Sequence, residues 1–115
     1  GQSAQAGIYT RSDGSYGTKM YFATTSSYAA GSYARFMIDY NGNVLPTTNG
    51  LYDLGSSGLR WKNIYTTDLQ LSNEGKTNDV DGTWGNYTIQ EGESELFLIN
   101  NRNGKKYKFN LTEVS

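Results

Sequence analysis

Two short runs near the C-terminal end of the chain constrain the fold most strongly. Residues 106–111 (KYKFNL) carry apolar side chains at alternate positions, residues 95–100 (ELFLIN) carry Leu96 and Leu98 two positions apart within an apolar run, and Asn103-Gly104 lies between the two segments. A period of two is typical of a half-buried strand, and Asn-Gly favours the positive φ angles of a tight hairpin turn. These features together predict a β-hairpin at this end of the chain.

The turn position predicts the register of this hairpin. A two-residue turn at Asn103-Gly104 pairs Leu98 with Phe109 and Leu96 with Leu111. The apolar residues expected on one face are Leu96, Leu98, Tyr107, Phe109 and Leu111.

The same signals recur through the rest of the chain. Alternation predicts strands over residues 19–24 and 33–40, followed by a tight turn at Asn41-Gly42. Residues 43–45 return from that turn, and we expect Pro46 to break the pairing. Shorter strands are expected over residues 61–66, 68–71 and 83–90. Helical periodicity is hard to find, so the predicted class is all-β.

The residue types that are missing exclude several kinds of site. The chain has no Cys and no His, so thiolate nucleophiles, disulfides and the commonest general base and metal ligand are absent. A net charge of −1 gives no footprint for nucleic acid, and no apolar stretch approaches the ~20 residues that span a bilayer. We therefore expect no enzyme activity, no cofactor, no metal, no nucleic-acid partner and no membrane insertion.

The acidic clusters support the same expectation. Residues 78–82 (NDVDG) fail the spacing of a calcium-binding loop, because Thr88 stands where a Glu is required. Glu91, Glu93 and Glu95 surround a single turn, where a solvated surface is expected in place of a pair of hydrolytic carboxylates.

The low content of large apolar residues suggests that one chain cannot build a deep core. Leu, Ile, Val and Phe make up 21 of 115 residues, whereas Tyr alone contributes 10. Short strands in so small a chain also leave sheet edges open. Packing against copies of the same chain closes those edges and buries the aromatic rings.

Two motifs resemble segments of phage tail fibres and related trimeric virion appendages. Residues 35–44 (RFMIDYNGNV) are similar to the R-M-x-I-D-x-x-G-N-V hairpin of those proteins. Residues 53–65 (DLGSSGLRWKNIY) are similar to their L-G-S-x-x-x-R-W-x-x-I-Y segment. The tail from Thr88 to Phe109 resembles the C-terminal end of structural proteins of marine tailed phages, cyanophages among them.

The resemblance implies short strands and hairpins in an intertwined, parallel homotrimeric fibre. It implies a place in the virion, among other tail proteins, in the apparatus that attaches to a host surface glycan or outer-membrane protein. Many such fibres continue into a self-cleaving chaperone that opens with a Ser-Asp pair. This chain has Ser72-Asn73 after Leu71, so that protease activity is not expected.

Three segments are expected. Residues 1–18 are the continuation of a longer fibre, residues 19–72 are the fibre region with both motifs, and residues 73–115 are a hairpin cap that serves as a trimerisation element. Attachment to the host and a purely structural role as spacer, collar, whisker or cap remain alternatives.

Candidate residues follow from these expectations. Packing between chains is expected at Phe36, Ile38, Leu54, Trp61, Ile64, Leu96, Leu98 and Phe109. Tyr16, Tyr28 and Tyr33 lie in or beside Ser- and Gly-rich stretches, the composition of adaptable binding loops, and Trp84 is a candidate sugar platform. The alternatives are that the tyrosines fill the trimer axis and that Trp84 covers the end of the hairpin.

Overall fold

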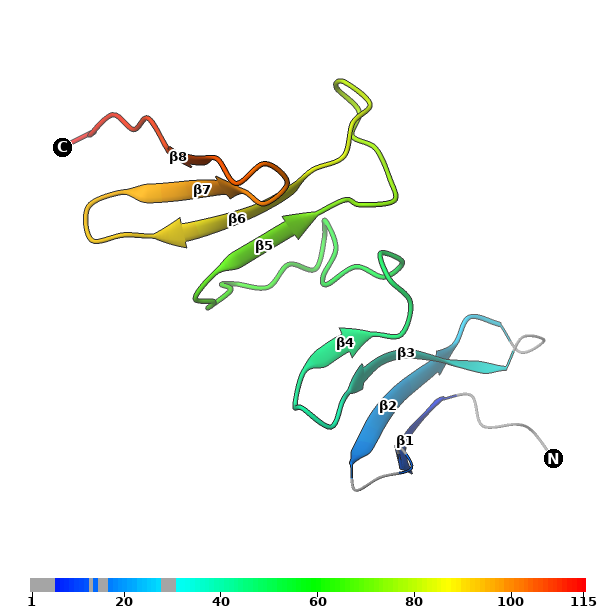
Figure 1. Cartoon of the computed structure of the whole chain (residues 1–115). Helices are drawn as coiled ribbons and strands as arrows, with labels where there is room; N and C mark the ends of the chain where they lie inside the picture. The colour runs from blue at the N-terminus through cyan, green and yellow to red at the C-terminus, as the bar shows by residue number, and fades with distance from the viewer. Residues whose placement is uncertain (1–5, 13, 15–16, 28–30) are drawn as a thin grey trace. The chain divides into compact units, whose positions relative to one another are not determined.

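The structure is a computed structural model that describes residues 6–12, 14, 17–27 and 31–115. Over these residues the chain forms eight strands in two antiparallel four-stranded sheets and contains no helix (Figure 1). The chain divides into two compact units, Gly1–Arg60 and Trp61–Ser115, and each unit holds one sheet. The predicted all-β class is therefore confirmed.

The N-terminal sheet is a meander with the order β1-β2-β3-β4. Its strands are β1 (Ala6–Ser12), β2 (Thr18–Thr25), β3 (Ser32–Ile38) and β4 (Val44–Pro46). Strand β1 was not predicted, because its sequence AGIYTRS carries too little alternation to stand out. It forms as the outer partner of β2, with Ile8 opposite Phe22.

The turn between β3 and β4 lies where Asn41-Gly42 predicts it. Asp39 accepts a hydrogen bond from Gly42 N at 2.9 Å through its backbone oxygen. Its carboxylate accepts hydrogen bonds from the backbone N–H groups of Asn41 and Asn43 at 3.0 and 2.9 Å. Gly42 has φ 86°, which a side chain would disfavour.

The expected break at Pro46 was wrong. Pro46 is the last residue of β4, lies opposite Phe36, and is followed by a further hydrogen bond from Thr47 N to Arg35 O at 3.0 Å. Backbone N–H groups alternate between the two sides of a strand, so the nitrogen of Pro46 lies on the unpaired side of this edge strand.

The C-terminal sheet has the order β5-β6-β7-β8. Its strands are β5 (Leu69–Ser72), β6 (Asn86–Glu91), β7 (Leu96–Asn100) and β8 (Lys106–Lys108). A long polar loop, residues 73–85, connects β5 to β6 (Figure 1).

The C-terminal hairpin is confirmed, but its predicted register was wrong. Leu98 pairs with Tyr107 rather than with Phe109. The loop is longer than two residues because Asn100 accepts from Gly104 N at 2.8 Å and donates from its own N–H to Lys105 O at 2.9 Å. A shift of two positions leaves every side chain on its predicted face.

The strand expected over residues 61–66 is absent. This stretch has no strand partner and is exposed along its length, with Tyr65 at 92%. No neighbouring segment pairs with residues 61–66 as a strand. An isolated strand would leave its backbone N–H and C=O groups without partners in the sheet.

Candidate interaction surfaces

One face of the N-terminal sheet is apolar along its length. The cross-strand register places two neighbouring rows of side chains across all four strands. The first row is Ile8, Phe22, Phe36 and Pro46, and the second is Thr10, Met20, Ile38 and Val44. The first row has a stacked pair of rings at its centre, Phe22 and Phe36, with centroids 4.4 Å apart. We call this surface the Phe22 face; its apolar members are Ile8, Met20, Phe22, Phe36, Ile38, Val44 and Pro46.

The Phe22 face remains open to solvent. Ile8 is 65% exposed and Val44 is 66% exposed, and even Phe36 in the middle of the face is 41% exposed. The opposite face is different in character: Tyr9 stacks on Tyr21 with a centroid separation of 5.2 Å. Next to that pair, Arg11 lies opposite Lys19.

The C-terminal sheet also has one apolar face and one face that is largely polar. Leu69, Ile89, Leu98 and Tyr107 form one row across its four strands. We call this surface the Leu98 face; its apolar members are Leu69, Leu71, Tyr87, Ile89, Leu96, Leu98 and Tyr107. Its opposite face carries the polar residues Gln70, Thr88, Gln90, Lys106 and Lys108, together with Phe97 and Ile99.

Over the described residues, only Ala23 and Thr88 are buried. The chain exposes 10003 Å², whereas a folded monomer of 12.7 kDa exposes about 6,200 Å² and two separate units of half that mass about 7,500 Å². The chain therefore presents roughly 2,500 Å² more surface than two ordinary small domains. The open sheet faces and the exposed segments outside the strands both contribute to that excess.

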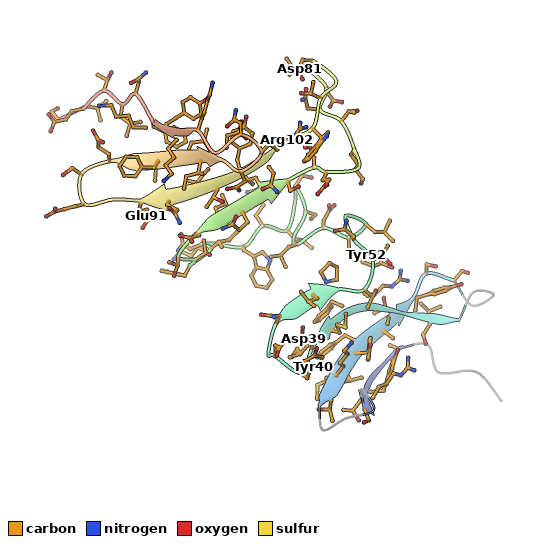
Figure 2. The ribbon with its side chains drawn as sticks, viewed as in Figure 1. Asp39, Tyr40, Tyr52, Asp81, Glu91 and Arg102 are labelled. Carbon is orange, nitrogen blue, oxygen red and sulfur yellow. The ribbon has the colours of Figure 1, made fainter. Side chains whose placement is uncertain are left out.

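The segment between the sheets is also rich in exposed apolar side chains. Leu54, Leu59, Trp61, Ile64 and Tyr65 are each between 65% and 92% exposed. Within the N-terminal unit, Tyr52 is tied back to the sheet by Arg35, which donates from Nη1 to the Tyr52 hydroxyl at 3.1 Å (Figure 2).

The predicted packing residues fall in four places. Phe36 and Ile38 lie on the Phe22 face, and Leu96 and Leu98 lie on the Leu98 face. Phe109 follows β8 and donates from its N–H to Leu96 O at 3.0 Å. Leu54, Trp61 and Ile64 lie in the irregular segment, at 79%, 65% and 73% exposure. Their part in packing between chains stays a prediction.

Several face residues were not singled out from the sequence. Ile8, Met20, Val44, Leu69 and Ile89 belong to the two faces only because of the register of their neighbours. Alternation within residues 19–24 was a usable signal for Met20 and Phe22. Leu69 lies in the strand predicted over residues 68–71, whereas nothing local marks Ile8, which depends on a pairing partner elsewhere in the chain.

The predicted binding aromatics have different surroundings. Tyr16 and Tyr28 lie outside the described residues. Tyr33 is 52% exposed, and its ring centre lies 5.7 Å from the Arg35 guanidinium carbon. Trp84 is covered by Arg102, whose guanidinium carbon lies 3.7 Å from the ring centre and whose Nη1 donates to Trp84 O at 3.0 Å.

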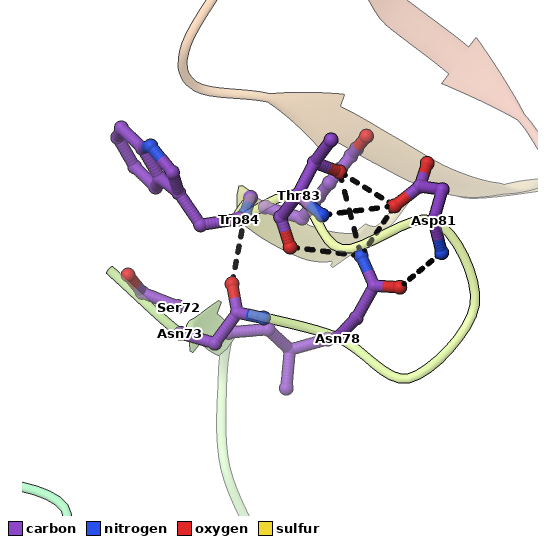
Figure 3. A pocket seen from close by; sticks show the side chains of 9 residues that line it. Ser72, Asn73, Asn78, Asp81, Thr83 and Trp84 are labelled. Atoms are coloured by element: carbon purple, nitrogen blue, oxygen red, sulfur yellow. Dashed lines mark hydrogen bonds between the residues drawn. The ribbon is translucent and has the colours of Figure 1, made fainter. Parts of the chain in front are cut away.

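A shallow hollow of about 500 Å³ lies beside Trp84 in the C-terminal unit (Figure 3). Asn78, Asp81 and Thr83 line it and bond mainly to one another. The Asp81 carboxylate accepts from Thr83 Oγ1 at 2.7 Å and from Asn78 Nδ2 at 2.8 Å. The hydrogen bonds from Thr83, followed by that from Asn78, lower the pKa of Asp81 below its ordinary value. This network orders the loop.

No chemical centre emerges among the residues described. Across ranges 6–12, 17–27 and 31–115 with Gly14, no three His, Cys, Asp or Glu side chains gather to hold a metal ion. Nor does this part of the chain contain a helix of the length and apolarity that crossing a membrane requires. The two apolar faces are therefore the strongest functional feature.

No protein-family model, curated protein or solved structure matches the chain.

Proposed function

We propose that the chain is a non-enzymatic segment of a homotrimeric phage tail fibre, or of a similar virion appendage, that contributes to attachment to the host cell. The observation that carries this proposal is the exposure of apolar side chains on both sheets, where only Ala23 and Thr88 of the described residues are buried. Apolar area of this size stays soluble when copies of the chain cover it.

The sequence motifs support the fibre assignment. The hairpin at residues 35–44 and the segment at residues 53–65 are the parts that resemble tail fibres. In this chain, Arg35 of the first motif donates a hydrogen bond of 3.1 Å to Tyr52, the residue just before the second motif. The absence of His and Cys supports action through surface contacts instead of catalysis.

A trimer also provides a simple mechanism of attachment. Three identical sites on one fibre bind a cell surface with an avidity far above the affinity of any single site. The exposed aromatics Tyr9 and Tyr40 supply rigid contact area for a receptor outside the apolar core of the assembly.

A purely structural role as spacer or trimerisation cap is the second candidate. The same observation favours it, because apolar faces that recur in both units serve assembly whether or not a receptor is bound. Deletion of the coding sequence for residues 1–115 from the phage genome separates the two roles. Loss of adsorption by intact particles supports attachment. Normal adsorption together with defective particle assembly supports the structural role and contradicts the attachment proposal.

A further inference from the structure

We propose that the Phe22 face and the Leu98 face are the surfaces through which the three copies of the chain pack against one another. This inference rests on the homotrimer of the proposed function and goes further by assigning an inside and an outside to each sheet. It predicts that the opposite faces, with Tyr9 and Tyr21 on one sheet and Gln70 and Lys106 on the other, remain in contact with solvent.

Charge distribution separates the two sides of the N-terminal sheet. In a ring of identical chains, a residue near the axis approaches its own copies, so a face with charges of one sign repels itself. The Phe22 face carries one charged strand residue, Arg35, whose guanidinium donates hydrogen bonds to Thr24 and to the Tyr52 hydroxyl. The opposite face places Arg11 directly across from Lys19. Self-association through the Phe22 face therefore gathers one hydrogen-bonded cation per chain, whereas the opposite face gathers two.

The C-terminal sheet shows the same contrast. Its Leu98 face has one charged strand residue, Glu91, at the far end of β6. The opposite face carries Lys106 and Lys108, and only Lys108 has an ion-pair partner, Glu95 at 3.4 Å. If three chains packed through this opposite face, the Lys106 and Lys108 side chains would bring six ammonium groups together. Packing through the Leu98 face instead brings leucine, isoleucine and tyrosine side chains together.

The surface area fits subunits of this kind. Each chain exposes roughly 2,500 Å² more than two independent units of its size, and obligate interfaces bury about 2,000–5,000 Å². Each unit carries one apolar face, and in a homotrimer the copies of each face pack against one another.

The chain offers a direct test because its two methionines lie on opposite faces. Met20 is opposite Ile38 on the Phe22 face, and Met37 is opposite Tyr21 on the other face. In the single chain, Met20 is 39% exposed while Met37 is partly buried. A monomer would therefore oxidise at Met20 at least as fast as at Met37.

The experiment exposes unmodified protein to hydrogen peroxide and follows sulfoxide formation at each methionine by peptide mass spectrometry. The proposal predicts at least tenfold slower oxidation of Met20 than of Met37 in the native protein, and equal rates in denaturant. Equal or faster oxidation of Met20 in a sample shown to be trimeric would overturn the face assignment while leaving the trimer intact. A monomeric sample would overturn both.

The C-terminal sheet is tested with neighbouring single-cysteine variants, since the chain has no cysteine of its own. Leu69→Cys places a thiol on the Leu98 face, and Gln70→Cys is the matched control on the other face of β5. In trimeric samples, we expect maleimide to label Leu69→Cys at least tenfold more slowly than Gln70→Cys. Equal labelling of the two thiols contradicts the assignment of this sheet. Should Leu69→Cys fail to assemble, Leu71→Cys repeats the measurement.

Discussion

Arg35 holds Tyr52 by two interactions at once. Its Nη1 donates to the Tyr52 hydroxyl at 3.1 Å, and its guanidinium carbon lies 5.5 Å from the centre of the Tyr52 ring. The other nitrogens donate to Thr24, from Nε to Oγ1 at 3.0 Å and from Nη2 to the backbone oxygen at 3.2 Å. One side chain on β3 therefore joins β2 to the segment that follows β4.

Replacement of Arg35 should weaken the attachment of the segment that follows β4, which contains Tyr52, to the N-terminal sheet. We expect Arg35→Lys to lower the free energy of unfolding by about 1–2 kcal/mol, because a lysine keeps the charge but loses the planar fork and the stacking. Tyr52→Phe should cost about 1 kcal/mol, because it removes one hydrogen bond and keeps the ring. Urea unfolding at a fixed chain concentration measures both. An Arg35→Lys protein as stable as the parent would argue against this link.

Gly104 closes the C-terminal hairpin with φ 76°, a backbone conformation that side chains disfavour. We expect Gly104→Ala to destabilise the chain by about 1–2 kcal/mol and Gly104→Asn to cost less, because Asn tolerates this region. Gly58→Ala is the matched control; Gly58 has open space around it and no positive φ. Equal effects of Gly58→Ala and Gly104→Ala on the urea midpoint would contradict the role of the turn.

The two hairpins mark how far local sequence determines this fold. Asn41-Gly42 and Asn103-Gly104 both form turns where the sequence predicts them. The exact C-terminal register was missed, because Asn100 lengthens the loop by accepting from Arg102 N at 2.9 Å through its side chain. A glycine alone does not reveal how many residues precede it in the loop.

The candidate surfaces were only partly predictable. The sequence indicates apolar rows within a strand, as at Phe36 and Ile38, because alternation is local. The complete Phe22 face depends on β1, whose place beside β2 is a non-local pairing that no short window contains. The Arg35–Tyr52 contact joins residues 17 positions apart and had no local signal for the same reason.

The Asp81 loop should respond to acid. Hydrogen bonds from Thr83 and Asn78 hold the pKa of Asp81 below its ordinary value of 3.8. A lowered folded pKa means that this stabilisation is present above pH 3.8 and is lost as the pH falls through the folded pKa. We expect the Thr83 amide NMR signal to titrate with a midpoint below 3.8. Asp81→Asn should abolish this titration and Asp79→Asn should preserve it; a midpoint above 3.8 would contradict the prediction.

Thr88 is the one buried polar side chain among the residues described. Its hydroxyl donates to Gln70 Oε1 at 2.6 Å and accepts from Asn101 Nδ2 at 2.9 Å, which links β5, β6 and the hairpin loop. Thr88→Val should cost about 1 kcal/mol, because it keeps the shape and removes both hydrogen bonds. Thr88→Ser keeps the hydroxyl, so it should leave slow hydrogen exchange at Asn101 N–H intact. Loss of that protection in both variants alike would contradict the role of the hydroxyl.

The number of chains in the native particle tests the central claim most directly. Sedimentation equilibrium measures mass without reference to shape. We expect a single species at three times the 12.7 kDa chain mass, which stays constant as the protein is diluted through the micromolar range. A stable, folded species at 12.7 kDa would contradict the homotrimer and the burial of the Phe22 and Leu98 faces.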